Sequence, residues 1–168
     1  GTHVTSAAEI FTIPSANLPW PEPNYKGAEL VTNGTFDTDS DWTKGTGWSI
    51  SGGVVTCDGS KTSTTNLDDV RTAPFNATVL NISFTLSGNT AGAIQPRLTG
   101  GVTVDGSYVS GDGVKTLRLV DTGNNSRIRF TATSDFVGSI DNISVREINP
   151  LSVSIAMDGR ATFADTGT

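Results

Sequence analysis

Residues able to do acid–base or nucleophilic chemistry are scarce in this sequence. His3 is the only histidine and lies near the N-terminus, which removes histidine-based triads, histidine general bases and the usual zinc sites. Cys57 is the only cysteine, and its place at a predicted strand end favours an inert small side chain over a reactive thiol. No Gly-x-Ser-x-Gly motif supplies a serine nucleophile. We therefore expect a protein that is not an enzyme.

The carboxylates are not predicted to supply acid–base catalysis either. A glycoside hydrolase needs an acid that stays protonated in an apolar setting, whereas nearly all acids here lie among Gly, Ser and Thr. The neighbouring pairs Asp68-Asp69 and Asp39/Asp41 occur in loop-like sequence, where solvated charges or turn formers are expected. Neither pair is predicted to be catalytic.

Asp141 is the carboxylate with the most unusual predicted environment. Alternation along 139–148 places it on the same face as Ile143 and Val145, so its charge would lean toward the apolar side. An unpaired charge there would be costly, and Asp141 therefore needs a partner. Backbone amides or the Ser139 hydroxyl would satisfy that need by hydrogen bonding, and a cation is the alternative.

The elements that must position these residues are short strands separated by Gly- and Asn-rich turns. The clearest is 79–87, where Leu80, Ile82, Phe84 and Leu86 share one face and polar residues the other. The pattern predicts about ten strands, at 29–36, 48–51, 54–57, 62–67, 79–87, 94–98, 102–104, 114–120, 127–132 and 139–148. The predicted fold class is all-β, a jelly-roll β-sandwich of two antiparallel sheets.

The predicted domain spans 29–148 and is closed by its two ends. Residues 29–37 and 138–145 are short apolar runs with acidic residues at their edges, and we expect them to lie side by side as first and last strands. Residues 1–28 read as an N-terminal tail and proline-rich linker that includes Trp20. After Pro150 the pattern restarts, so 149–168 is expected to begin a following module or a hairpin extension.

Charge and hydropathy exclude two classes of partner. The net charge of −6 repels phosphate backbones, and no basic cluster offsets it, so nucleic acid is excluded. No apolar run approaches the length that a bilayer requires, which excludes membrane insertion by a helix.

Four segments of the chain resemble a known family. Asn33-Gly-Thr-Phe-Asp37, the block 41–53, Ile82-Ser-Phe-Thr-Leu86 and the block 134–147 are similar to jelly-roll domains, related to carbohydrate-binding modules, in bacteriophage and prophage tail or other virion proteins. The first and last motifs are shared with carbohydrate-binding modules attached to polysaccharide-degrading enzymes. The resemblance implies a galactose-binding-like, non-catalytic sandwich, although fold alone does not fix function.

The resemblance also implies a structural calcium ion. Similar modules often carry Ca²⁺ near these two motifs, and Asp37 matches a position that is commonly Glu or Asp there. Asp37, Asp141 and loop carbonyls would supply the hard oxygen ligands that Ca²⁺ prefers. Hydrogen bonding of Asp141 without a metal stays open as the alternative.

A glycan site would combine an aromatic face with planar polar side chains. Tyr108, Arg97 and Gln95 are the predicted set, with Tyr108 in a turn and the other two on the preceding strand. Trp42 and Trp48 are further candidates near the first hairpin, although both belong to the recurring motif and packing is the alternative interpretation. With aromatics at only 7%, strong binding to a flat polysaccharide surface is not expected.

Two functions follow from the residues and the resemblance. The first is a virion module, in a tail, a fibre or elsewhere in the particle, that recognises cell-surface glycans or contacts other virion subunits. That module would oligomerise symmetrically, and often as a trimer in fibres. The alternative is a monomeric carbohydrate-binding module that targets an appended polysaccharide-degrading enzyme. The expected location is the virion, or the extracellular space for the alternative.

Overall fold

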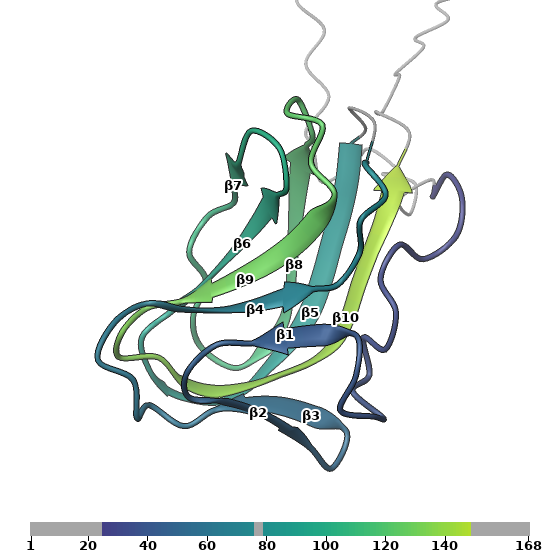
Figure 1. The fold of residues 1–168 in the computed structure, drawn as a ribbon. Coiled ribbons are helices and arrows are strands. Elements are labelled where there is room, and N and C mark those ends of the chain that lie inside the picture. The colour runs from purple at the N-terminus through teal and green to yellow at the C-terminus, as the bar shows by residue number, and fades with distance from the viewer. Residues whose placement is uncertain (1–24, 76–78, 149–168) are drawn as a thin grey trace, which may run out of the picture.

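The computed structural model describes residues 25–75 and 79–148, and all regular structure within them is β-strand (Figure 1). No helix in this part of the chain is long and apolar enough to cross a membrane. The predicted all-β class is confirmed. The strands are β1 (Trp42–Lys44), β2 (Trp48–Ser51), β3 (Val54–Cys57), β4 (Thr65–Asp69), β5 (Val79–Ala91), β6 (Ile94–Thr99), β7 (Val104–Asp105), β8 (Gly113–Val120), β9 (Arg127–Ala132) and β10 (Val137–Ile148).

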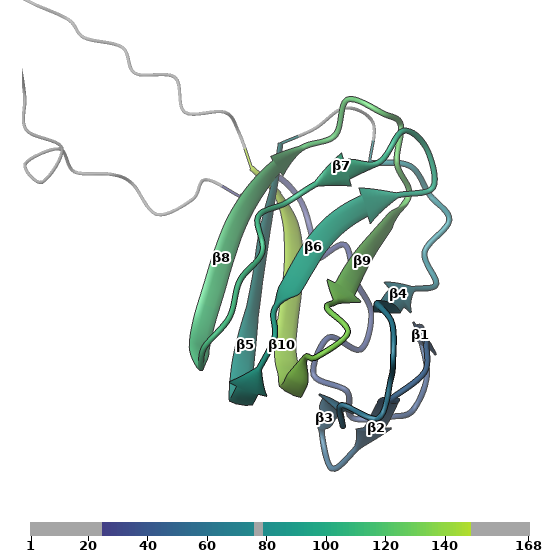
Figure 2. The same cartoon turned by 90° about the vertical axis from the view of Figure 1, so that its left-hand side faces the viewer.

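Two antiparallel sheets of five strands form the jelly-roll sandwich. The front sheet, which faces the viewer in Figure 1, has the order β1-β4-β9-β6-β7. The back sheet has the order β2-β3-β10-β5-β8. The view turned by 90° shows the two layers from the side, with β6, β7 and β9 in one and β5, β8 and β10 in the other (Figure 2). Strands distant in sequence are thus neighbours in each sheet.

The core between the sheets is built by strand alternation. Phe84 packs edge-on against Phe130 of the front sheet, with ring centroids 5.0 Å apart. On the other face of β5, Ser83 and Thr85 are half-buried, so the predicted division into an apolar and a polar face is confirmed. Asn81 departs from it, because this outward-facing residue is buried. The four inward side chains of β5 are at most 1% exposed: Leu80, Ile82, Phe84 and Leu86.

The first apolar segment lies beside the last strand, as expected, but it is not a strand. The Leu30 amide donates to the Val145 carbonyl at 2.9 Å, and the Ile143 amide donates to the Gly34 carbonyl at 2.9 Å. No regular ladder connects these bonds, so the prediction of a strand over 29–36 is wrong. The segment is an irregular chain that supplies separate hydrogen bonds to the edge of β10.

Glu29 makes the densest contact in this segment. Its Oε1 accepts hydrogen bonds from the amides of Val145 at 2.6 Å and Leu30 at 3.1 Å, and its Oε2 accepts one from the Ser144 hydroxyl at 2.6 Å. Hydrogen bonds to an ionised acceptor are stronger than neutral ones. The carboxylate therefore ties the N-terminal segment to the last strand.

A β-bulge in β10 changes which way Asp141 points. Asp141 pairs with Thr85 and Ser144 pairs with Ser83, so β10 has one more residue than β5 across this interval. Asn142 lies in this bulge and has a left-handed backbone conformation, with φ 51°. The inserted residue reverses the alternation, which places Asp141 on the outer, polar face of the back sheet. The prediction that Asp141 leans toward the apolar side is wrong for this reason.

Smaller differences concern strand ends and loops. The strand Trp42–Lys44 was not predicted, and the strands expected at 62–67 and 102–104 are found at Thr65–Asp69 and Val104–Asp105. Asp68 and Asp69 therefore lie in a strand, and their prediction as solvated or turn residues is wrong. Trp20, most of the linker and the hairpin pattern of 149–168 lie outside the described residues.

Gly34 gives a test of the contact between the first segment and β10. A Cβ built on Gly34 would lie 2.0 Å from the Ile143 carbonyl oxygen, so alanine there must push the two backbones apart. We expect Gly34→Ala to lower the free energy of unfolding by more than about 2 kcal/mol, measured by urea denaturation.

Gly52→Ala is the control. Gly52 has open space around it and only its φ of 63° disfavours alanine, so its cost should be about 1 kcal/mol. Equal losses for the two variants would contradict the close approach at Gly34.

Candidate functional site

The outer face of the front sheet carries two rows of polar side chains. In β6, alternation directs Ile94 and Leu98 into the core and leaves Gln95 and Arg97 on the outside. The same alternation in β9 and β4 leaves further polar residues on that face: Arg129, Thr131, Asn66 and Asp68. Because neighbouring strands are in register, these side chains form rows that run across the strands. We call this surface the polar face.

The first row crosses four strands. Asp68 is paired with Arg129, Arg129 with Arg97, and Arg97 with Asp105. Each arginine holds the carboxylate on its outer side, with Arg129 Nε 2.6 Å from Asp68 Oδ1 and Arg97 Nε 2.6 Å from Asp105 Oδ1. These ion pairs fix the positions of the two arginine side chains. The side chains of Arg129 and Arg97 are 30% and 28% exposed, so they stay accessible from solvent.

The second row lies beside the first and is uncharged. Asn66 and Gln95 are both paired with Thr131. The Thr131 hydroxyl donates to Asn66 Oδ1 at 2.8 Å, and Gln95 Nε2 donates to the Gly106 carbonyl at 3.0 Å. These bonds fix the planes of both amides. The two rows together present oriented amide, guanidinium and carboxylate groups.

The structure brings together part of the predicted glycan set. Gln95 and Arg97 lie on the polar face, and Tyr108 is 55% exposed in the segment that follows β7. Sequence reasoning missed Arg129 and Asn66, which come from strands far away in the chain. Alternation in 127–132 was the available signal for Arg129, but its position opposite Arg97 depends on strand register.

Trp42 and Trp48 lie in the core, where they are 5% and 7% exposed. The Trp42 ring packs between Phe36 and Phe130, at centroid distances of 5.5 and 6.3 Å, and its Nε1 donates to the Asn33 carbonyl at 3.0 Å. Trp48 packs on Phe136 at 6.1 Å. The structure thus shows the packing alternative for both indoles and leaves neither ring face open to a sugar.

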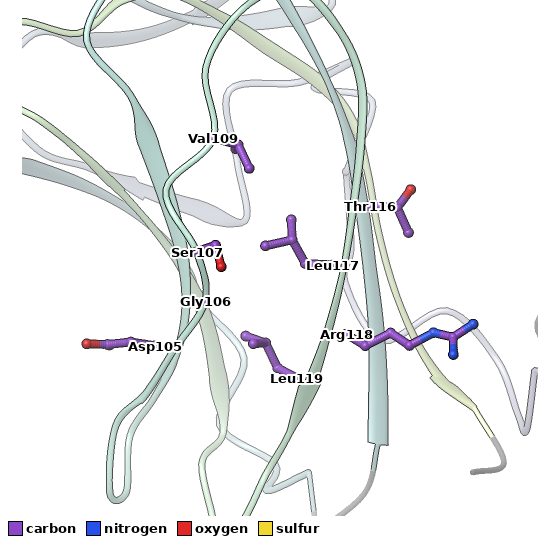
Figure 3. A pocket seen from close by; sticks show the side chains of 8 residues that line it. All are labelled: Asp105, Gly106, Ser107, Val109, Thr116, Leu117, Arg118 and Leu119. Carbon is purple, nitrogen blue, oxygen red and sulfur yellow. The ribbon is translucent and has the colours of Figure 1, made fainter. Parts of the chain in front are cut away.

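A cleft of about 540 Å³ lies at the open edge of the sandwich, between β8 and the segment 105–109. Leu117 and Leu119 point across it toward that segment, whereas Thr116 and Arg118 point the opposite way (Figure 3). Among its lining residues, Asp105 is already paired with Arg97. The cleft has an apolar floor and offers no convergent set of acids, bases or nucleophiles.

The two predicted calcium ligands each have hydrogen-bond donors. Asp141 accepts from the amide of Asn142 at 2.6 Å and from its side chain at 3.0 Å, and Asp37 accepts from the Thr35 hydroxyl at 2.8 Å. Among residues 25–75 and 79–148, no group of three or more His, Cys, Asp or Glu side chains is arranged to hold a metal ion. The hydrogen-bonded alternative is thus available to Asp141, and calcium stays a prediction.

Asp69 is a buried carboxylate beneath the polar face. It is 4% exposed, its Oδ1 accepts from the Ile128 amide at 3.2 Å, and its Oδ2 has no partner among the described residues. Burial raises the pKa of Asp69 to about 7, against the opposing effects of the Ile128 amide and the arginines at 71 and 127. A carboxyl that keeps its proton to near neutral pH is thus built into β4.

Solved structures with a similar fold include carbohydrate-binding modules. A tyrosine-to-alanine mutant of CBM29-2, from family 29, matches with a TM-score of 0.48 and 16% identity over 75% of this chain and 93% of that chain. TmCBM61, solved with β-1,4-galactotriose, matches with a TM-score of 0.47 and 16% identity over 71% of this chain and 98% of that chain. No protein-family model and no curated protein sequence matches this chain. The likeness concerns the fold alone.

The raised pKa of Asp69 predicts a pH-dependent stability. The folded state binds the proton up to about pH 7, whereas the unfolded state releases it near the ordinary value of 3.8. This group therefore lowers the free energy of unfolding as pH rises from about 4 to 7. We expect Asp69→Asn to be more stable than the parent at pH 8, by roughly 4 kcal/mol because the pKa of Asp69 is raised from 3.8 to about 7, and nearly equal to it at pH 4.

Thermal unfolding of both proteins between pH 4 and 8 measures this effect. Asp105→Asn is the control, because Asp105 is an exposed carboxylate that is also paired with an arginine and is not among the groups that shift the pKa of Asp69. A pH profile that is the same for Asp69→Asn and its parent would show that Asp69 titrates normally.

Chelation tests the calcium prediction. If Asp37 and Asp141 hold a structural Ca²⁺, EDTA lowers the Tm, added Ca²⁺ restores it, and Asp141→Asn reproduces the loss without further response to EDTA. An unchanged Tm in EDTA would leave the hydrogen bonds from Asn142 as the full account of Asp141.

Proposed function

We propose that this domain is a non-catalytic glycan-recognition module and that the polar face is its binding surface. One observation carries the proposal: planar polar side chains lie in two rows across β4, β9, β6 and β7, held in fixed orientations by hydrogen bonds to one another. Sugar hydroxyl groups both donate and accept, so amides, guanidinium groups and carboxylates in fixed planes suit their recognition.

The side chains of the polar face are held in place before any ligand binds, which favours a binding surface over a surface that is only solvated. Ordering a long side chain on binding costs about 0.5–1.5 kcal/mol, so a face that is ordered beforehand loses less affinity. Arg97, Arg129, Gln95 and Asn66 are all positioned in the free domain by the bonds described above. A saccharide chain would meet hydrogen-bonding groups that need little rearrangement.

The outer face of the back sheet has a different composition. On β5, β10 and β3 it presents small hydroxyl side chains such as Ser83, Thr85, Ser139 and Thr56. Thr56 and Ser139 hydrogen-bond to each other at 2.8 Å. Short hydroxyls cannot reach far above a sheet or form paired hydrogen bonds.

The back sheet also carries one row of larger polar side chains, Arg146, Asn81 and Arg118. In that row Arg146 lies over the Tyr25 ring at 4.3 Å and donates to the Gly27 carbonyl at 3.0 Å. We place the site on the front sheet because its polar side chains form two adjacent rows and hydrogen-bond to one another.

Tyr108 is an exposed aromatic residue in the segment that follows β7 in the chain. It follows Asp105 in the chain by three residues, and Asp105 belongs to the first row. Stacking of its ring on a sugar would add to hydrogen bonding. One aromatic beside the polar face favours moderate affinity that depends mainly on hydrogen bonds.

The carboxylates of the polar face support a non-catalytic role. Asp68 and Asp105 lie three strand spacings apart, or about 14 Å. Glycoside hydrolases place their two carboxyl groups about 5–9.5 Å apart. Each carboxylate is also held by an arginine. These two acids are therefore expected to orient arginines and not to cleave a glycosidic bond.

The setting in which the module works is a further part of the proposal. The motif resemblance favours a virion module for host-surface recognition or particle assembly, and targeting of an appended polysaccharide-degrading enzyme is the alternative. The molecular mass in solution separates the two, because a symmetric trimer favours the virion module and a monomer favours the enzyme-targeting module.

Substitutions on the polar face test glycan binding. On an array of neutral and acidic oligosaccharides, we expect defined binding that weakens about tenfold in Arg97→Ala and in Gln95→Ala, because each loses a hydrogen-bonding group. Titration calorimetry with the strongest ligand measures the change.

Arg118→Ala is the matched control. Arg118 is an exposed arginine on β8 of the back sheet, and removing it changes the net charge by the same amount. Binding that falls equally in Arg118→Ala and Arg97→Ala, or that is absent for every saccharide, would contradict the proposed site.

A further inference from the structure

The polar face contains one arrangement that works against stability. Arg97 and Arg129 are directly opposite each other on neighbouring antiparallel strands. Side chains in such pairs have Cβ atoms about 4.5–5.5 Å apart, and like charges there are destabilising. Proteins tend to keep an unfavourable pair of like charges of this kind where it serves a function. The pair therefore points to a role in binding.

The arginines are anchored in a way that leaves their terminal nitrogens available. Each uses Nε to hold its own carboxylate, Asp105 for Arg97 and Asp68 for Arg129. Within residues 25–75 and 79–148, the Nη atoms of both guanidinium groups have no hydrogen-bond partner. Two oriented forks of donors thus lie next to each other at the centre of the polar face.

The first row has two positive groups between two negative ones, so its centre is positive. The arginines occupy the inner strands β9 and β6, whereas the carboxylates occupy the flanking strands β4 and β7. Arg127 adds a third positive charge, because it precedes Arg129 by two residues and shares its face of β9. The local balance over these five groups is one net positive charge in a chain of net charge −6.

We propose that the glycan bound by the polar face carries an anionic group, a uronate carboxylate or a sulfate ester, and that Arg97 and Arg129 bind it through their Nη atoms. This inference rests on the proposed glycan-binding function and names its substrate class. Guanidinium forks match the geometry of carboxylate and sulfate oxygens and bind them with two parallel hydrogen bonds.

Two further features favour an acidic over a neutral saccharide. The rows that define the polar face contain no aromatic side chain and Tyr108 lies beside them, so a neutral chain would have little stacking surface to compensate for weak hydrogen bonds. The net charge of −6 gives no diffuse attraction for polyanions, so binding of an acidic glycan would require this local site.

Matched polymers test the proposal. Polygalacturonate is compared with its carboxyl-reduced, neutral counterpart, and dextran sulfate with dextran, so that the two arms separate carboxylate from sulfate. We expect the domain to bind at least one acidic polymer about tenfold more tightly than its neutral partner. Arg97→Gln and Arg129→Gln should each weaken acidic binding about tenfold, while Arg118→Gln leaves it unchanged.

The variant Arg97→Lys separates the contribution of paired hydrogen bonds from that of the positive charge. Lysine keeps the positive charge but cannot form two parallel hydrogen bonds, so affinity for the acidic polymer should still fall several-fold. The variants should remain folded, because both ion pairs lie on the outer face of the sheet and leave the core unchanged, and their Tm values check this.

The outcomes distinguish the two proposals. Equal binding of an acidic polymer and its neutral partner, with both weakened in Arg97→Gln, would overturn the anionic preference and leave glycan recognition in place. Acidic binding that falls as much in Arg118→Gln as in Arg97→Gln would also overturn it. Absence of binding to any saccharide on the array would overturn both.

Discussion

The edge of β10 is only partly covered by the back sheet, and the rest of the fold depends on how the remaining backbone groups find partners. β3 pairs with Gly138–Ile140, whereas β10 continues to Ile148. The irregular segment beginning at Tyr25 completes the edge through backbone hydrogen bonds, and the Glu29 carboxylate accepts the Val145 amide and the Ser144 hydroxyl. Buried backbone groups need such partners. The N-terminal segment is therefore part of the sandwich.

This closure fixes the position of the last strand, and through it the arrangement of both sheets. β10 pairs with β5 over most of its length, and inward side chains of β5 pack against those of β9, as Phe84 does with Phe130. β9 in turn carries Arg129 and Thr131 on its outer face. Alternation makes the polar face the reverse side of the core, because a one-residue slip would exchange the two sets of side chains.

The polar face combines order with local electrostatic cost. Pairing with Asp68 and Asp105 offsets part of the repulsion between Arg129 and Arg97, and it also fixes the direction of both guanidinium groups. Asp69 lies on the inner side of the same strand as Asp68 with a raised pKa. The pKa of Asp69 is raised because its carboxyl faces the core, whereas the neighbouring Asp68 side chain points outward to Arg129.

Local alternation in the sequence was sufficient to predict the all-β class, the strands β2, β3 and β9, the apolar face of β5, and Gln95 and Arg97 as surface groups. Partners distant in the chain were not predictable in the same way. Arg129 lies opposite Arg97 only because β6 and β9 pair in one register, and Asp141 faces outward only because a bulge at Asn142 reverses the alternation. The indoles are buried because the two sheets pack face to face. Alternation is set by each residue and its neighbours, whereas register, bulges and burial follow from packing between strands that the chain order does not specify.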